Sequence, residues 1–233
     1  MRLPLLQIES LAAGYGKSDV LDDVSFALFS GSLAYVLGPG GAGKTTLLMT
    51  IAGLVRPKRG AIRLDGEDIR RKRPNELLAR GIAYVPHNRL LFSSLSVRDN
   101  LLAGVWRETD RPRIDADAAR LATRFPFLQT CASQNASRLT NGERQLLAIA
   151  RALMSRPRLL LLDDPFDALA PLEAERIADL GAELAEEGTA VVIAQRNATP
   201  IAWPGEQAYR LDGGRLCRSD SCAPASPALP ASL

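Results

Sequence analysis

The sequence predicts an α/β fold in which helices cover a mostly parallel sheet, with an antiparallel β-subdomain at the start and an inserted α-helical subdomain. Three observations lead to this prediction. Short alternating stretches occupy residues 3–30, continuous apolar runs separated by helical patterns follow, and residues 97–154 show no strand pattern. The length of 233 residues, 46% of them apolar, suits one globular domain with an insertion.

The β-subdomain is predicted from the alternation of apolar and polar residues near the start of the chain. Residues 19–28, with the sequence DVLDDVSFAL, are typical of an antiparallel strand that has one face in water. Residues 32–37 then form a continuous apolar run, which indicates a buried strand. This run ends in a glycine-rich turn, and residues 45–54 have the spacing of a helix. The parallel sheet therefore begins with a strand, a loop and a helix.

The same alternation continues to the end of the domain. Further buried strands are predicted at 82–85, 159–162 and 190–194, and helices at 115–124, 143–154 and 171–187. Strands that alternate with helices in this way form one parallel sheet. We expect one domain over residues 1–218, with the helical subdomain inserted at about 97–155. Residues 219–233, rich in Ala, Pro and Ser, predict a disordered tail.

Charge and composition exclude several classes of protein. The 29 Lys and Arg residues against 26 Asp and Glu give a net charge of +3, far below the basic field of nucleic-acid binders, so nucleic acid is not an expected partner. No apolar run approaches the roughly 20 residues that cross a bilayer, and the first residues are too polar for a signal peptide, which predicts a cytoplasmic chain. The three cysteines do not have metal-ligand spacing, which argues against a zinc site.

The glycine-rich turn is a phosphate-binding loop. Residues 38–45 read GPGGAGKT and fit the pattern G-x-x-x-x-G-K-[ST] between a buried strand and a helix, the context that this motif requires. Glycines let successive N–H groups point at a polyphosphate, and the following helix adds its positive end. Lys44 is expected to reach the β- and γ-phosphates, and Thr45 to ligate magnesium. The predicted phosphate-binding residues are Gly38, Pro39, Gly40, Gly41, Ala42, Gly43, Lys44, Thr45 and Thr46.

Two acidic residues follow the apolar run at 159–162. Asp163 comes at the predicted carboxyl end of this buried strand, where ligands of open α/β sheets bind. A carboxylate in that position suits a magnesium ion held together with Thr45. The sequence therefore predicts a Mg²⁺–nucleotide site with Thr45 and Asp163 as metal ligands.

These motifs, with the segment LTNGERQ at 139–145, resemble those of ABC-type ATPases over about residues 5–218. Within that superfamily the chain is similar to the ATP-binding subunit of branched-chain amino acid importers, through AGYGK at 13–17, GIAYVP at 81–86 and AIARALMSRPR at 148–158. The resemblance implies ATP and Mg²⁺ as cofactors. It also implies a second ABC ATPase subunit packed head to tail, permease subunits on the inner face of the membrane, and indirectly a substrate-binding protein.

The resemblance assigns roles to further residues. Tyr15 would stack its ring on the adenine base. The signature residues would bind the γ-phosphate held by the opposite subunit, at a helix N-terminus. His87 would begin a loop that senses nucleotide and touches the permease, although a solvent-facing histidine is an equal alternative. The implied signature residues are Leu139, Thr140, Asn141, Gly142 and Glu143.

Several positions depart from the family pattern. Asp164 replaces the glutamate that orients the attacking water, and its carboxylate is about 1.5 Å further back, so we expect slow hydrolysis. Arg196 replaces a histidine, or the glutamine of the branched-chain subfamily, and could pair with phosphate, form a salt bridge or be exposed. His87 replaces a glutamine or glutamate. We take Lys44, Asp164 and Arg196 as the candidate catalytic residues.

The signature is altered as well, because Thr140 and Asn141 replace the usual serine and glycine. If Asn141 needs a positive φ it is the best-tolerated alternative to glycine, yet its Cβ would crowd the partner's phosphate. Asp164 and Arg196 affect the chain's own ATP, whereas Thr140 and Asn141 affect the partner's ATP. Two hypotheses follow: an importer ATPase, or a catalytically weak half of a heterodimer. A soluble ABC protein outside transport is a third, less favoured reading.

A short basic run, Arg70-Arg71-Lys72-Arg73, follows a probable hairpin. Such a run is typical of a solvated loop. Contact with lipid headgroups or with the permease is the alternative.

Overall fold

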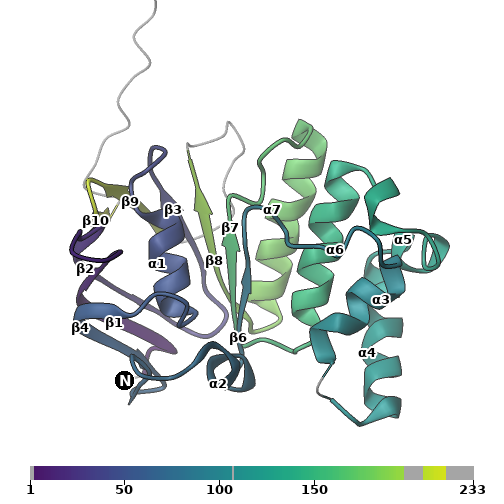
Figure 1. The fold of residues 1–233 in the computed structure, drawn as a ribbon, viewed down its shortest axis with the longest axis horizontal. Coiled ribbons are helices and arrows are strands. Elements are labelled where there is room, and N and C mark those ends of the chain that lie inside the picture. The colour runs from purple at the N-terminus through teal and green to yellow at the C-terminus, as the bar shows by residue number, and fades with distance from the viewer. Residues whose placement is uncertain (1–2, 107, 197–206, 219–233) are drawn as a thin grey trace, which may run out of the picture.

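Two β-sheets and a block of helices make up the part of the molecule that the structure describes (Figure 1). The computed structural model describes residues 3–106, 108–196 and 207–218. The tail predicted at 219–233 lies outside these residues. No helix within the described ranges is long and apolar enough to cross a membrane.

The first sheet is antiparallel, as the alternation near the start of the chain predicts. Its strand order is β2-β1-β4-β5, and β1 pairs with β2 on one side and β4 on the other. The sequence did not predict β4, because its first half is charged and contains Gly60, and burial alternates only in its last four residues. The strands are β1 (Leu6–Ala13), β2 (Leu21–Leu28), β4 (Pro57–Leu64) and β5 (Glu67–Asp68).

The second sheet has six strands in the order β10-β9-β3-β8-β7-β6, and all its neighbours are parallel except the edge strand β10. The apolar runs that predict buried strands form β3, β6, β7 and β8. Residues 207–218, which carried no strand prediction, add the pair at the edge. The strands are β3 (Leu33–Leu37), β6 (Ile82–Val85), β7 (Leu159–Asp163), β8 (Ala190–Gln195), β9 (Gln207–Asp212) and β10 (Arg215–Arg218).

Both faces of the parallel sheet are covered, which explains why its strands are apolar throughout. In β7, Leu159 and Leu161 pack into a core shared with the antiparallel sheet and α1 (Lys44–Ile51). Leu160 and Leu162 point the other way, into a core shared with the helices that follow β6. The helix predicted at 45–54 is shorter than expected, because Gly53 adopts a positive φ of 74° and ends it.

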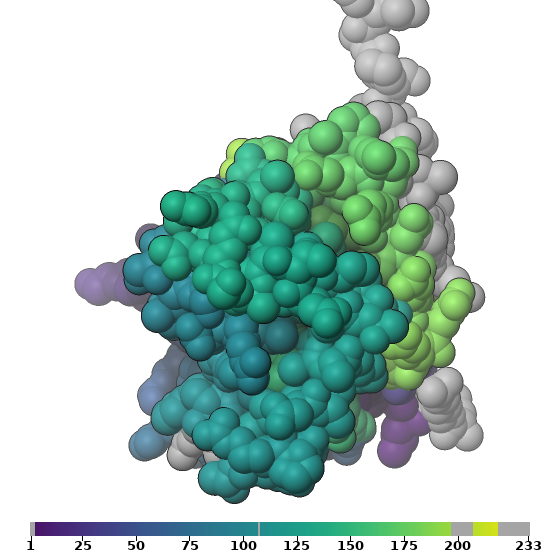
Figure 2. Space-filling view, turned by 90° about the vertical axis from the view of Figure 1, so that its right-hand side faces the viewer, coloured from purple at the N-terminus to yellow at the C-terminus, as the bar shows by residue number. Residues whose placement is uncertain are grey.

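The inserted helical subdomain follows β6 and returns to the sheet at β7, as predicted. No strand occurs between Val97 and Leu153 among the residues that the structure describes. The face turned to the viewer in Figure 2 consists mostly of this segment, with α7 (Pro171–Glu186) beside it. Its helices are α3 (Val97–Leu102), η1 (Ala103–Val105), α4 (Arg111–Arg124), α5 (Phe127–Thr130), η2 (Ala136–Arg138) and α6 (Asn141–Leu153). A short helix, α2 (Pro74–Ala79), lies between β5 and β6.

A buried asparagine closes the loop that leads into this subdomain. Asn100, which is fully buried, donates its amide hydrogens toward the carbonyls of Phe92, Leu95 and Ser96. Its side-chain oxygen accepts a hydrogen bond from the Phe92 N–H at 2.8 Å. A buried amide that is satisfied on both sides holds the loop in one conformation.

Candidate nucleotide-binding site

A cavity of about 310 Å³ lies where β3, β7 and β8 end. The carboxyl ends of parallel strands meet at one edge of the sheet, which is where open α/β sheets bind ligands. The structure thus brings together residues that are up to 181 positions apart in the sequence. The lining residues are Tyr15, Val20, Gly40, Gly41, Gly43, Lys44, Thr45, Thr46, Asp164 and Arg196.

The phosphate loop is held by its own backbone. The Gly38 N–H donates to the Gln195 carbonyl at 3.2 Å, and the Ala42 N–H donates to Pro39 at 3.2 Å. Gly43 has a φ of 106°, and a Cβ there would lie 2.8 Å from the Leu21 side chain, so this position requires glycine. Among the described residues, no acidic residue lies in the first turn of α1, and no side chain caps its N-terminus. Its N–H groups are therefore available to a phosphate.

Lys44 is buried inside this loop. Its Nζ donates to the carbonyl oxygens of Gly38 at 2.8 Å and Pro39 at 3.0 Å. Burial lowers the pKa of Lys44, while the nearby charges of Asp164 and Asp163 oppose this shift. The ammonium group is therefore positioned at the cavity wall by two backbone contacts.

Thr45 and Asp163 lie side by side below the loop. The Thr45 hydroxyl donates to Asp163 Oδ1 at 3.1 Å, and Asp163 Oδ2 accepts from the Tyr84 hydroxyl at 3.0 Å. Burial raises the pKa of Asp163, and both hydrogen bonds counteract this rise. A hydroxyl and a carboxylate are the oxygen ligands that Mg²⁺ prefers, so this pair fits the predicted ion.

Tyr84 is a site residue that sequence reasoning missed. It lies within the buried strand β6, and its hydroxyl reaches Asp163 from the neighbouring strand β7. A tyrosine within an otherwise aliphatic strand was the available signal. Burial raises the pKa of Tyr84 well above its usual value, so the hydroxyl stays protonated and acts as a donor.

Asp164 and Arg196 form an ion pair at the cavity. Arg196 Nε lies 3.2 Å from Asp164 Oδ2, and the side chains are 55% and 9% exposed, respectively. Arg196 thus forms a salt bridge while more than half of its side chain is exposed, and its pairing with phosphate stays a prediction. The other carboxylate oxygen, Asp164 Oδ1, is buried without a hydrogen-bond partner among the described residues. Asp164 adopts a φ of 45° while its N–H donates to the Ala194 carbonyl at 2.7 Å.

The signature segment begins α6. Thr140 is the N-cap: its hydroxyl accepts from the Glu143 N–H at 3.2 Å, and Glu143 Oε2 accepts from the Thr140 N–H at 2.8 Å. Asn141 is the first helical residue, so the condition of a positive φ does not hold; its side chain lies 3.4 Å from the Ala168 carbonyl. A Cβ at Gly142 would lie 2.3 Å from Glu173 Oε1, so a larger residue there would make the Glu173 side chain move.

The signature does not line the nucleotide cavity of its own chain. Leu139 is buried in the core of the helical subdomain. A separate cavity of about 240 Å³ is lined by Thr140, Gly142 and Glu143, together with residues of α7. The signature residues and the phosphate loop therefore lie at different cavities of this chain.

The loop after β6 is fastened to the signature helix. Arg151 of α6 donates to the carbonyls of Arg89 and Leu90, each at 2.8 Å, and Arg89 Nε donates to Gln145 Oε1 at 2.7 Å. His87 lies at the start of this loop, with Nε2 3.7 Å from Asp167 Oδ2, and does not line the cavity. Sequence reasoning missed both arginines, because a helical or loop arginine carries no pattern of its own.

Tyr15 lies at the rim of the cavity. Its ring is 54% exposed, and its hydroxyl lies 3.8 Å from Met49 Sδ of α1. A half-exposed aromatic ring beside a phosphate loop can stack on a base. Stacking on adenine remains a prediction.

Gly38 gives a prediction for stability. A Cβ at this position would lie 2.1 Å from the Leu211 carbonyl oxygen, which is backbone and cannot move without shifting β9. We expect Gly38→Ala to lower the free energy of unfolding by about 2–3 kcal/mol, as in other overpacked sites. Chemical denaturation would measure it, with Gly40→Ala as the control, because nothing lies within 4 Å of a Cβ there. Equal stability of both variants would contradict this packing argument.

The comparisons with known proteins agree with this geometry. The family described as ABC transporter matches residues 21–167. The chain is 36% identical to the high-affinity branched-chain amino acid transport ATP-binding protein BraG of Pseudomonas aeruginosa, over 94% of both chains. It is 33% identical to the lipopolysaccharide export system ATP-binding protein LptB of Haemophilus influenzae, over 92% of this chain and 89% of that protein.

Solved structures show the same fold. The ADP conformation of MJ1267, an ATP-binding cassette of an ABC transporter, has a TM-score of 0.82 and 25% identity, over 92% of this chain and 90% of the other. The predicted family and α/β fold, with its β-subdomain and helical insertion, are confirmed. The chain belongs to the ABC transporter family as one of its ATP-binding subunits, which hydrolyse ATP.

Proposed function

We propose that the chain is the ATP-binding subunit of an importer of branched-chain amino acids. The similarity to BraG along nearly the whole of both chains carries this proposal. A branched-chain amino acid transport ATP-binding protein of Archaeoglobus fulgidus is also 34% identical, over 91% of this chain. The export relatives share the ATP site, so the choice of solute depends on the permease and must be tested in cells.

The test is solute uptake in the source cell. Deleting the gene is expected to lower uptake of labelled leucine, isoleucine and valine, and the wild-type gene should restore it while the Lys44→Ala gene should not. Unchanged uptake, with loss of lipopolysaccharide from the cell surface instead, would reject the importer in favour of export.

The geometry supports a mechanism of assisted hydrolysis. N–H groups of the phosphate loop bind the β- and γ-phosphates, and Lys44 offsets their charge. Thr45 and Asp163 would hold Mg²⁺, which supplies further neutralisation of the phosphate charge when bound. Among the described residues Asp164 is the only carboxylate lining the cavity, and so it would orient and deprotonate the attacking water. Asp164 can act in this way only if Arg196 first releases Asp164 Oδ2. While the ion pair holds, Asp164 is a weak base.

A groove of about 490 Å³ fits an apolar segment of the permease. It lies between α2 and β6 on one side and η1 and α6 on the other, and includes the exposed side chains of Leu78, Phe92 and Trp106. Relatives named as transport subunits need such a surface to reach a membrane partner. Tyr84 and Arg151 line the groove and also contact Asp163 and the Arg89–Leu90 backbone, respectively. A permease segment bound in this groove would therefore contact Tyr84, which connects the groove to the nucleotide site, and Arg151, which holds the loop after β6.

The groove gives a second prediction. Leu78→Asp combined with Trp106→Ala should remove the importer activity, because each loss of a central apolar contact costs about 2 kcal/mol of binding, or roughly 30-fold. The affinity for ATP should stay the same. Leucine uptake and ATP binding would be measured in parallel, with Leu54→Asp, an exposed leucine outside the groove, as the control. Normal uptake in the double variant would reject the groove as the docking site.

The Asp164–Arg196 ion pair favours a second candidate function, an ATP-binding half-site with little activity of its own. A carboxylate engaged by arginine is a poorer proton acceptor than a free one. Such a subunit would act in a heterodimer, in which its phosphate loop retains ATP while a partner performs the turnover. Light scattering with ATP would test this: a stable homodimer with full turnover would reject the half-site.

A further inference from the structure

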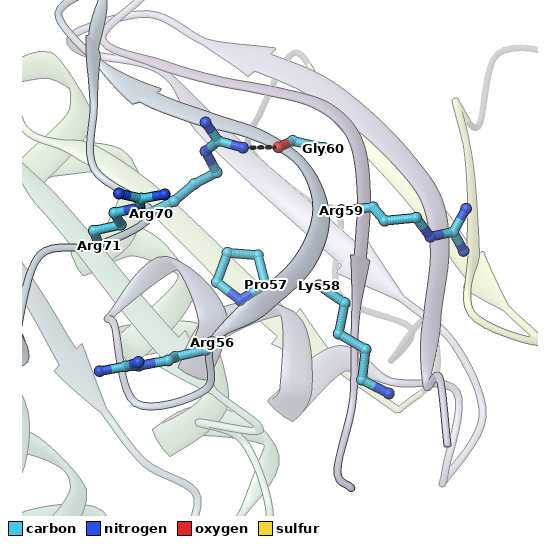
Figure 3. Close-up of a pocket in the computed structure, with 7 residues that line it drawn as sticks. All are labelled: Arg56, Pro57, Lys58, Arg59, Gly60, Arg70 and Arg71. Carbon is cyan, nitrogen blue, oxygen red and sulfur yellow. Dashed lines mark hydrogen bonds between the residues drawn. The ribbon is translucent and has the colours of Figure 1, made fainter. Parts of the chain in front are cut away.

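A second polar cavity, of about 460 Å³, lies at the start of β4, apart from the nucleotide site. The two cavities share no lining residue. Figure 3 shows Arg56 and Arg71 on the same side of the turn and Arg59 pointing to the opposite side. The lining residues are Arg56, Pro57, Lys58, Arg59, Gly60, Arg70 and Arg71.

The positive charge of the protein is concentrated around this cavity. Residues 56–73 contain eight Lys and Arg residues against three Asp and Glu, a net of +5, whereas the whole chain carries +3. The rest of the chain is therefore net negative. A local cluster of cations in a chain that is otherwise slightly net negative attracts anions to one place.

Most of these cations are already engaged. Arg70 Nε lies 3.0 Å from both carboxylate oxygens of Asp68, and its Nη1 donates to the Gly60 carbonyl at 2.7 Å, as Figure 3 shows for the latter bond. Arg70 holds the pKa of Asp68 at about 2, so the pair stays ionised. On the other side of the turn, Lys58 and Arg59 pair with Asp19 at 2.7 and 3.5 Å.

Arg56 and Arg71 differ from their neighbours. Both are exposed, and neither side chain has an ion pair or hydrogen bond with another described residue. Two unpaired guanidinium groups line this cavity, next to the guanidinium of Arg70, which is held in place. Each guanidinium group is planar and offers several N–H donors. This donor set matches phosphate oxygens, which arginine binds in bidentate fashion.

We propose that this cavity binds a phosphate group, with Arg56 and Arg71 as its direct ligands and Arg70 held in place at the cavity wall. A phospholipid headgroup and a soluble phosphate share this chemistry. The position favours the lipid: in Figure 1, α2 lies between β4 and the helices that border the apolar groove, and Leu78 of α2 lines that groove. A permease segment in the groove would bring the cavity near the membrane surface. Only this choice of source rests on the proposed docking.

The experiment is vesicle binding by the purified full-length chain, without any permease, so it does not depend on the proposed importer. Phosphatidylcholine vesicles would be compared with vesicles that contain 30% phosphatidylglycerol, at low and at physiological salt. The wild type should bind only the anionic vesicles, and Arg56→Gln with Arg71→Gln should weaken binding about 25-fold, roughly fivefold for each arginine. Arg98→Gln with Arg111→Gln is the matched control, since these are two exposed arginines outside the cavity.

Calorimetry with inorganic phosphate and pyrophosphate distinguishes the sources. Binding of these anions that the Arg56/Arg71 variant loses, without vesicle binding, would support the site with a soluble ligand. Vesicle binding that both double variants lose equally would overturn the proposal, because it would show a general charge effect. Tighter binding to duplex DNA than to either phosphate probe, lost in the same variant, would also overturn it and assign the cavity to nucleic acid. ATP affinity should be unchanged in both variants.

Discussion

Lys44→Ala is expected to lower the ATPase rate at least about 100-fold and to weaken ATP binding about 10- to 100-fold. The ammonium group is buried at the wall of the nucleotide cavity and held by the carbonyls of Gly38 and Pro39. A charge fixed in advance contributes most where negative charge develops during the reaction, and removing one such donor costs 100-fold or more in rate. Its hydrogen bonds to phosphate account for the loss of affinity.

The measurement is ATP binding by calorimetry and steady-state phosphate release with Mg²⁺. Lys58→Ala serves as the control, because Lys58 is a lysine that pairs with Asp19 outside the nucleotide cavity. Thermal unfolding of both variants would separate a local effect from loss of fold, since Lys44→Ala leaves two carbonyls without their donor. Turnover of Lys44→Ala close to that of the wild type would show that another group binds the γ-phosphate.

The elements that the sequence predicts well are those whose pattern follows from burial. Leu159–Leu162 is apolar throughout because both faces of β7 are covered. The phosphate loop can be recognised in the sequence because its backbone conformation requires glycines at fixed positions. By contrast, β4, β9 and β10 mix charged and apolar residues, so no regular pattern marks them. Of these, β10 is an edge strand, β9 lies next to it, and β4 pairs on one side only with the two-residue strand β5. Their pairing depends on distant strands, which a local window does not contain.

The site shows the same division. Residues within a motif, such as Lys44 and Asp163, could be identified from spacing alone. Tyr84 and Arg151 could not, because their partners lie 79 and 61 or more residues away and only the folded sheet brings them together. For Arg196, the sequence left three alternatives; the structure shows an ion pair with Asp164 at 3.2 Å on a side chain that is 55% exposed, and pairing with phosphate stays a prediction. Contacts between side chains of different elements are a property of the fold.

Asp164→Glu is expected to raise the ATPase rate by about 100-fold. The extra methylene moves the carboxylate about 1.5 Å toward the phosphates, and misplacement of a reacting group by about 1 Å costs on the order of 100-fold. The longer side chain also leaves the position in which Arg196 Nε engages Asp164 Oδ2. Because residue 164 has a φ of 45°, which aspartate tolerates better than glutamate, the variant should be about 1 kcal/mol less stable while it is more active.

Two further variants distinguish the effect of the position of the carboxylate at residue 164 from the effect of its charge. Arg196→Gln removes the ion pair and leaves the short carboxylate in place, so it should raise the rate less than Asp164→Glu. Asp164→Asn keeps the size and removes the base, and it should abolish the residual turnover. Phosphate release under single-turnover conditions would be compared for all three. If the wild type already hydrolyses ATP as fast as Asp164→Glu, then aspartate suffices in this cavity and the ion pair with Arg196 must open during each cycle. The half-site reading would then be wrong, and the slow step would have to lie in the altered signature at Thr140 and Asn141.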